Sequence, residues 1–317
     1  MSNSLAAFYG ASRRAGTTAR TYVLLLKPRV MSLVVFTAAA GLIMSPTRPD
    51  APIALAIILM IALGGGAAGA LNMWWDADID AVMRRTRGRP VPRGQIESRA
   101  ALLFGLAMSV FSVGALWALS NGLAAGLLAF TIFFYIVIYT IWLKRRSPQN
   151  IVIGGAAGAL PPMVGWAAAT GEVGLPALSM FLLIFMWTPP HFWSLSLFMN
   201  DDYQRAGVPM LPVTHGRKVT RNHILGYTFV LAVIAMLPLF SGIGGPIYAA
   251  TALLLNFRLC TAALGLWRRQ EDAARSDHYE RERAFFRLTL WYLFLHFAAL
   301  IADTALFSFG GRFGGLI

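Results

Sequence analysis

Long apolar stretches alternate with short polar segments along almost the whole 317-residue chain. Each stretch is close to the roughly 20 residues that a helix needs to cross a bilayer, and each is too continuous for the alternating pattern of a barrel strand. Helices are predicted because a lipid-facing backbone must satisfy its hydrogen bonds within its own segment. The pattern predicts nine spans, at 28–46, 52–75, 101–119, 122–143, 150–170, 175–198, 224–242, 245–266 and 286–308.

The spans leave little sequence for any other domain. The predicted organisation is a basic cytoplasmic N-terminal tail (1–27), one transmembrane domain (28–308) and a short C-terminal tail (309–317). Composition agrees, because the chain is 57% hydrophobic and only 13% charged, with a mean hydropathy of +0.61. A soluble domain carries about a quarter charged residues. The expected fold class is therefore an all-α polytopic membrane protein.

The distribution of positive charge predicts how the spans are oriented. Most of the 27 Lys and Arg residues lie in the N-terminal tail and in the loops after spans two, four, six and eight. Short loops that are rich in Lys and Arg face the cytoplasm, so the N-terminus and these loops are expected there. The net charge of +13 is then mostly a consequence of topology, and no nucleic-acid partner is expected.

The first 27 residues bear on location. They contain no acidic residue and several Ser, Thr and Arg, a composition shared by mitochondrial transit peptides and by basic cytoplasmic tails. We favour the cytoplasmic (inner) membrane of a bacterium, with the mitochondrial inner membrane as the alternative. The single cysteine, Cys260, excludes an intramolecular disulfide and a paired-cysteine metal site.

The second span ends in an unusual group of acids, in "LNMWWDADIDAVMRRTRGRP" at 71–90. Asn72, Asp76 and Asp80 are spaced four apart, so on a helix they fall on one stripe that rises about 12 Å. Asp78 points away and is expected to be solvated. Carboxylates at membrane depth cost roughly 3 kcal/mol each, so they usually face a polar cavity. A stripe of oxygen ligands suits a hard cation such as Mg²⁺.

A second acidic cluster follows span six in "WTPPHFWSLSLFMNDDYQRAGVPMLPVTHG" at 187–216 and contains Asn200, Asp201 and Asp202. In both regions a proline and a glycine follow the last aspartate at ten and fourteen residues. We therefore expect spans two and six to lie side by side, with both clusters at one cytoplasmic cavity that holds Mg²⁺ and a polyphosphate. A transporter is the rival class, but its charged sites lie nearer the membrane midplane.

With these motifs the chain resembles the intramembrane prenyltransferases of the UbiA superfamily. The first cluster matches their Asn-x-x-x-Asp-x-x-x-Asp motif. Three further segments resemble the branch of the family that farnesylates haem: "YTIWLKRRSPQNIVIGGAAGALPPMVGW", "WTPPHFWSLSLF" and "DDYQRAGVPMLPV". The likeness covers about residues 25 to 305. One departure concerns the second motif, whose aspartates are usually four apart; here positions 205 and 206 are Arg and Ala.

The resemblance implies a UbiA-type helical bundle and a specific reaction. A farnesyl group passes from farnesyl diphosphate to a vinyl group of protohaem IX, water adds, and haem O and diphosphate result. It implies Mg²⁺ or Mn²⁺ as the cofactor, with haem as a substrate. Expected partners are both substrates, the lipid bilayer and the downstream haem A synthase. The alternative is prenylation of an aromatic acid such as 4-hydroxybenzoate.

The resemblance also suggests roles for individual residues. Asn72, Asp76, Asp80 and Asp202 are expected to bind the metal, and together with Asp201 they form the catalytic set. Arg85 and Arg89 are expected to bind the diphosphate; Lys144 and Arg145 either do the same or only carry topological charge. His191 is expected to contact haem iron, a propionate or the diphosphate where Pro189 and Pro190 open the helix, the alternative being a packing histidine bonded to backbone.

Overall fold

The computed structural model describes residues 19–307, and within that range the chain forms helices, turns and loops without a strand. Eight helices are long and apolar enough to cross a membrane, and a bent pair at the N-terminal end makes a ninth span. The all-α polytopic fold is therefore confirmed. Residues 1–18 of the predicted N-terminal tail and the whole predicted C-terminal tail, residues 309–317, lie outside the described residues.

The nine spans follow the predicted segments closely. In chain order they are α2 (Ala19–Leu25) with α3 (Pro28–Ile43), α4 (Ala51–Trp75), α6 (Ser98–Leu119), α7 (Gly122–Phe133) with η1 (Phe134–Leu143), α8 (Asn150–Ala159) with α9 (Pro161–Thr170), α10 (Leu175–Phe198), α13 (Gly216–Ile234) with α14 (Leu237–Phe240), α15 (Pro246–Trp267) and α17 (Glu280–Phe307). Short helices α5 (Ala77–Val82), α11 (Asn200–Arg205), α12 (Leu211–Thr214) and α16 (Glu271–Ser276) lie in the connecting segments.

Several spans are interrupted where the apolar pattern shows no break. α2 and α3 meet at an angle of 56° at Lys27, whose φ of 51° is left-handed, and Pro28 begins the new helix. Pro161 and Pro162 begin α9 after α8, since proline is tolerated in the first turn of a helix. By contrast, α10 stays continuous through Pro189 and Pro190, so the expectation that these prolines open the helix is wrong.

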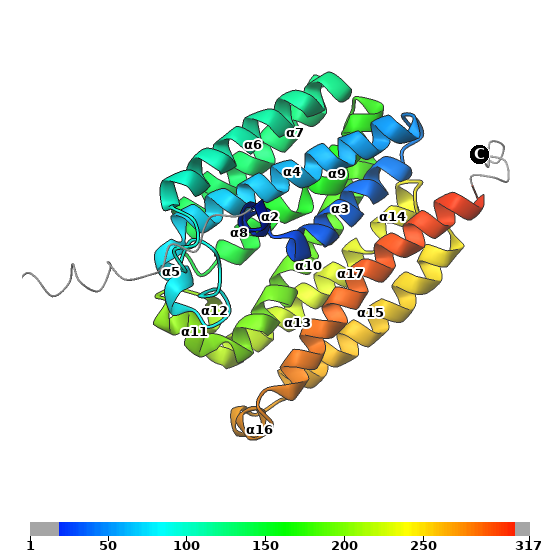
Figure 1. Cartoon of the computed structure of the whole chain (residues 1–317). Helices are drawn as coiled ribbons and strands as arrows, with labels where there is room; N and C mark the ends of the chain where they lie inside the picture. Colours follow the sequence, from blue (N-terminus) through cyan, green and yellow to red (C-terminus); the bar gives the residue numbers. More distant parts are fainter. Residues whose placement is uncertain (1–18, 308–317) are drawn as a thin grey trace, which may run out of the picture.

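The helices form two groups that share a central pair (Figure 1). One apolar core joins α3 and α9 to α4, α6 and α7, and the other joins α3, α8 and α9 to α10, α13, α15 and α17. Within residues 19–307, α4 and α10 are not among the helix pairs that pack extensively. The expectation that spans two and six lie side by side is therefore wrong, because α8, α9 and η1 fill the space between them.

The central pair is held by backbone contact at two glycines. A Cβ atom added at Gly41 of α3 would lie 2.0 Å from the carbonyl oxygen of Pro162, and one added at Gly165 of α9 would lie 2.1 Å from that of Ala38. Small residues let membrane helices approach closely, and here the approach leaves no room for a methyl group. Both apolar cores depend on this contact, because each of them contains residues of α3 and α9.

We therefore expect Gly165→Ala to destabilise the protein by about 1–3 kcal/mol, the usual cost of overfilling a packed interior. Thermal unfolding in detergent micelles measures the effect. Gly126→Ala in α7 is the matched control, because a Cβ atom there meets nothing within 4 Å. That control should keep or slightly raise the melting temperature, since Ala favours helix over Gly by about 1 kcal/mol. Equal melting of the two variants would contradict the prediction.

Candidate active site

Asn72, Asp76 and Asp80 form a buried row, although the helix that carries them is interrupted at Asp76. α4 ends at Trp75, Asp76 forms the joint, and α5 begins at Ala77. Asn72, Asp76 and Asp80 all expose 3% of their surface or less, whereas the Asp78 side chain is 64% exposed. The sequence-based separation of Asp78 from the stripe is confirmed.

Each member of the stripe is paired with a basic side chain from another segment. Lys27 Nζ donates to Asn72 Oδ1 at 2.7 Å, and Lys144 Nζ donates to Asp76 Oδ2. Arg89 binds both Asp80 oxygens, at 2.6 and 2.8 Å. Buried carboxylates need such partners, because an unpaired charge loses its hydration without compensation. The pairing places three cations around the row, where a polyanion would meet them.

The end of span four supplies two partners of the acidic row, Thr140 and Lys144. Residues 134–143 form a π-helix, a form that is often found at functional sites. Its buried Thr140 accepts a hydrogen bond from Asn72 Nδ2 at 3.1 Å, and Lys144 follows directly after its end. Asn72 Nδ2 also donates to Asp76 at 2.7 Å. Asn72 therefore connects Lys27, Thr140 and Asp76. These bonds explain why an amide stands one helical turn before Asp76.

Lys27 is the site residue that sequence reasoning missed. Its charge was attributed to membrane topology, yet its side chain reaches the first residue of the motif from the bend between α2 and α3. A left-handed backbone at a residue other than glycine is uncommon and often marks a functional position. The available signal was the Lys-Pro pair at the start of the first span, because a proline there begins a new helix.

The second cluster turns one carboxylate inward and one outward. Asp202 is buried and pairs with Arg205 of its own helix, whereas the Asp201 side chain is 83% exposed and lies 3.8 Å from Arg217. Three carboxylates in the described part of the chain have a buried oxygen with no hydrogen-bond partner, and two of these oxygens, Asp76 Oδ1 and Asp202 Oδ2, belong to the acidic clusters. Arg145 Nη2 lies 3.6 Å from Asp76 Oδ1 and forms an ion pair with it.

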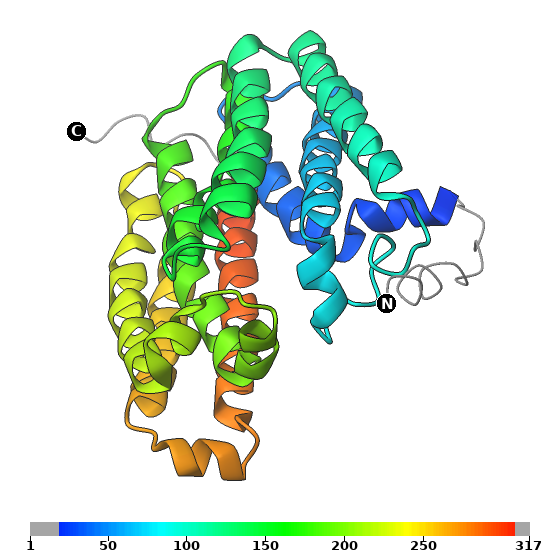
Figure 2. The same ribbon diagram turned by 90° about the vertical axis from the view of Figure 1, so that its left-hand side faces the viewer.

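The two acidic regions meet at one end of the bundle, as expected. Ile79 and Met83 of the first region pack with Tyr203, Val208 and Met210 of the second in one apolar cluster. Figure 2 shows α5 in cyan and the yellow-green α11–α12 segment toward the same end of the helices. Burial raises the pKa of Tyr203, and the positive charge of Arg85 acts in the opposite direction.

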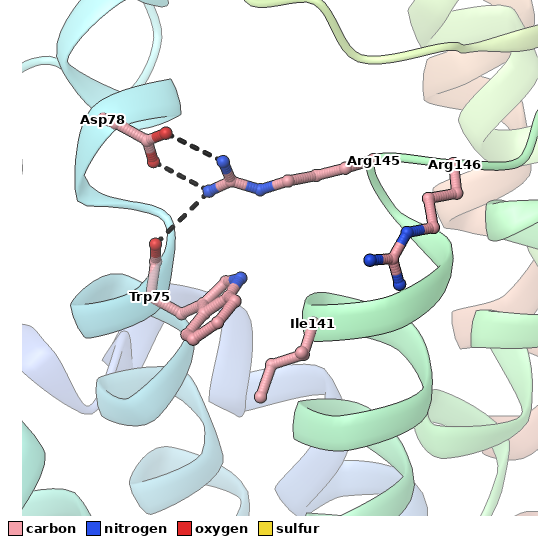
Figure 3. A pocket seen from close by; sticks show the side chains of 5 residues that line it. All are labelled: Trp75, Asp78, Ile141, Arg145 and Arg146. Atoms are coloured by element: carbon pink, nitrogen blue, oxygen red, sulfur yellow. Dashed lines mark hydrogen bonds and ion pairs between the residues drawn. The ribbon is translucent and has the colours of Figure 1, made fainter.

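Arg145 lies across the opening between these segments (Figure 3). It binds Asp78 through two hydrogen bonds of 2.7 and 2.8 Å and donates to the Trp75 carbonyl oxygen at 3.3 Å. These bonds hold the pKa of Asp78 below its ordinary value. The pair borders two pockets of about 280 and 290 Å³, which also contact Ile141 and Arg205, respectively. Arg145 thus lines both pockets and forms an ion pair with Asp78 between them.

The donor set fits a hard cation only if a ligand supplies further oxygens. In the part of the chain that the structure describes, no three Asp, Glu, His or Cys side chains are grouped tightly enough to hold a metal ion alone. Mg²⁺ usually takes one or two protein carboxylates and completes its shell with substrate phosphates and water. The two unpartnered carboxylate oxygens match that requirement.

His191 lies in α10, and its ring packs against α17. Trp187 stacks on one face of its ring and Phe286 on the other, with ring centroids 4.2 and 4.5 Å away. Its Nδ1 lies 2.8 Å from the hydroxyl oxygen of Thr289. The hydrogen-bond partner of His191 is therefore a side chain rather than the backbone, while its ring is packed between two helices.

The buried row of acids and bases lies at one end of a membrane-spanning helical bundle, and the chain belongs to the UbiA prenyltransferase family, whose model matches residues 33–291. Among its relatives are proteins named "Protoheme IX farnesyltransferase". The one from Cereibacter sphaeroides is 62% identical over 289 residues, 91% of this chain and 93% of that protein. The one from Paracoccus denitrificans is 61% identical over 282 residues, 89% of this chain and 92% of that protein.

Solved structures support the fold assignment. A digeranylgeranylglyceryl phosphate synthase aligns with a TM-score of 0.72 over 90% of this chain and 98% of its own, at 16% identity. A UbiA homologue from Archaeoglobus fulgidus, described as bound to DMAPP and Mg²⁺, aligns with a TM-score of 0.60 over 86% of this chain and 99% of its own, also at 16% identity. At such identities the likeness concerns the fold alone.

Proposed function

We propose that this chain transfers the farnesyl group of farnesyl diphosphate to a vinyl group of protohaem IX, with addition of water, to give haem O and diphosphate. The observation that carries the proposal is the 62% identity, over 91% of the chain, to proteins named for that activity. The buried row of acids and bases supports it, because departure of diphosphate is a reaction in which charge develops on phosphate oxygens.

The basic side chains bind the leaving group in this proposal. Lys27, Arg89 and Lys144 exchange their contacts with the acidic row for contacts with phosphate oxygens, and Arg85 and Arg145 close over them from the loops. Arg binds phosphate in a bidentate manner and Lys acts as a point charge. Because these cations are already held at the row, little reorganisation is needed when negative charge grows on the diphosphate.

The acids exposed by that exchange are the proposed metal ligands. Asp76, Asp80, Asn72 and Asp202 would hold Mg²⁺ or Mn²⁺, and Asp201, at the surface, would contribute through its charge. When bound, the ion supplies positive charge that stabilises the departing diphosphate. The unpartnered oxygens of Asp76 and Asp202 support the assignment, because a buried carboxylate oxygen without a partner is costly.

The chemistry that follows is carbon–carbon bond formation in a dry cavity. The C1–O bond of farnesyl diphosphate breaks, its electron pair leaves with the diphosphate, and an allylic cation remains. The terminal carbon of the haem vinyl group attacks C1, and the new cation on the inner vinyl carbon takes a water oxygen while the water proton passes to diphosphate. Surrounding apolar helices keep water from the first cation.

The protein is an integral membrane protein with bacterial relatives. We place it in a bacterial inner membrane with the acidic end and the N-terminus at the cytoplasmic face, because the basic loops gather at that end. Haem O is apolar and remains in the bilayer, so the haem A synthase that consumes it is proposed as a neighbour in the same membrane.

Product analysis tests the function. The purified protein is incubated in detergent with farnesyl diphosphate, Mg²⁺ and haem, and extracted porphyrins are examined by mass spectrometry. The expected product is haem increased by one farnesyl group and one hydroxyl. Replacing haem with 4-hydroxybenzoate is the matched acceptor control and should give no product. A prenylated phenol, or no product from either acceptor, would overturn the proposal.

We further expect a chelator to abolish turnover and added Mg²⁺ or Mn²⁺ to restore it. The reason is that, in this proposal, the buried carboxylates hold an ion whose shell is completed by the diphosphate, and its positive charge stabilises the leaving group. The product assay with EDTA, followed by titration of each ion, measures the effect. Zn²⁺ and Ca²⁺ serve as controls, because their preferred coordination geometries differ from the octahedral geometry of Mg²⁺. Full activity in excess EDTA would remove the metal from the proposal.

A further inference from the structure

The imidazole of His191 is fixed more firmly than packing requires. Trp187 and Phe286 stack on its two faces with interplanar angles of 18° and 25°. The indole is itself anchored, because Trp187 Nε1 donates to the Thr289 backbone carbonyl at 2.6 Å. The ring therefore cannot leave its plane without breaking an aromatic stack and disturbing a buried hydrogen bond.

The position of the proton on this ring follows from the partners of Thr289. The threonine hydroxyl has one proton, which it donates to the Phe286 carbonyl oxygen at 2.7 Å. Toward His191, at 2.8 Å, the same oxygen can then only accept. His191 Nδ1 must be the donor, so Nδ1 carries the proton. Because a neutral imidazole has a single N–H, Nε2 bears a lone pair.

The lone pair on Nε2 remains reachable. His191 retains 6% of its surface, whereas His296 retains none. Among the described residues, Nε2 of His296 is a fully buried atom without a partner, and Nε2 of His191 is not in that group. An unprotonated nitrogen cannot donate to a propionate or to a diphosphate, but it can bind a metal ion. Of the three roles considered for His191, only iron ligation matches this tautomer.

We propose that Thr289 is a positioning residue that holds His191 in the Nδ1–H tautomer and so presents Nε2 as an axial ligand to the haem iron. The inference rests on the proposed function, since it takes haem as the substrate. Metal-binding histidines usually donate their second N–H to a fixed acceptor, which sets the ring orientation and increases ligand basicity. The Thr289 hydroxyl acts as that acceptor, and its own bond to Phe286 strengthens it.

Haem titration of the purified protein tests the inference without turnover. Ferric haem is added to the wild type and to the variants Thr289→Val, Thr289→Ser and His191→Ala, and the Soret band and low-temperature EPR spectrum are recorded. Loss of such an outer partner typically weakens metal binding 10–100-fold. We expect Thr289→Val to weaken haem binding to that extent and to lose the histidine-ligated signal. Thr289→Ser, which restores the acceptor, should recover both.

Two controls separate ligation from folding. Melting temperature and helical circular dichroism should match between Thr289→Val and Thr289→Ser, and Thr289→Ala serves if Val is not tolerated at this buried position. His215→Ala, which removes an exposed histidine, should leave the spectrum unchanged. Identical spectra for the wild type and Thr289→Val, or a serine variant as defective as the valine variant, would overturn the inference.

The proposed function and this inference fail in different ways. If the wild type makes farnesylated haem but its haem spectrum does not change in His191→Ala, the iron ligation is wrong and the function stands. If the wild type neither binds haem nor makes that product, the function is wrong and the inference falls with it.

Discussion

Asp76→Asn is expected to lower the turnover number by about three orders of magnitude, which corresponds to about 4 kcal/mol of transition-state stabilisation. Asp76 is fully buried, is paired with Lys144, and has one oxygen without a hydrogen-bond partner. The variant removes the negative charge that a metal ion would neutralise, and removal of a single stabilising contact at a developing charge already costs about 10²–10³-fold.

The same geometry predicts that the Asp76→Asn protein still folds. Lys144 and the Asn72 side chain both donate to Asp76 Oδ2. An amide oxygen can take that place, and its NH₂ group can take the place of the unpartnered Oδ1. A neutral amide is also cheaper at membrane depth than a carboxylate. Steady-state kinetics and thermal melting measure the two effects separately.

The matched control is Asp50→Asn, which changes an exposed carboxylate at the other end of α4. It should leave both turnover and melting unchanged. If Asp76→Asn retained more than a tenth of the wild-type turnover, the carboxylate would not bind the metal, and the proposed ligand set would have to be abandoned.

Lys27→Met is expected to reduce turnover by about 10²-fold, the second largest effect. Its ammonium group lies 2.7 Å from Asn72 Oδ1 and is one of three cations held at the acidic row. Methionine preserves the apolar stem but removes the charge that would follow the diphosphate. Because this contact strengthens as charge develops, kcat should fall more than KM for farnesyl diphosphate rises.

The control for that experiment is Arg29→Met, which removes a neighbouring exposed charge. Both variants lose one positive charge from the same region, so membrane orientation and insertion should change equally. Unaltered kinetics in Lys27→Met, or an equal loss in Arg29→Met, would show that Lys27 carries only topological charge, as its place in the sequence first suggested.

The spans could be predicted from the sequence because lipid imposes one simple requirement, a helix of apolar residues long enough to cross. The start of α13 at Gly216 and of α17 at Glu280 was missed by several residues, since helices that leave the bilayer continue through polar sequence. The break between α2 and α3 was also missed, because a left-handed lysine leaves no trace in hydropathy.

The candidate site could be predicted only in part, for a related reason. The stripe of Asn72, Asp76 and Asp80 follows from helical periodicity, which is a local property. Which bases face it depends on contacts between residues up to 68 positions apart, such as Asp76 with Lys144. The tautomer of His191 likewise depends on Thr289, 98 positions away. Spacing along one helix cannot reveal such partners.

The close contact between α3 and α9 has a consequence for biogenesis. The hydrogen bond from Thr47 to the Ala169 carbonyl, just beyond that contact, joins residues 122 positions apart. At about 5–20 residues per second, the ribosome needs roughly 6–25 seconds to make that intervening chain. For that time the first spans stay in the membrane with the face of α3 around Gly41 uncovered. Nascent chains should therefore be most sensitive to membrane proteases and most dependent on insertion chaperones until α9 arrives.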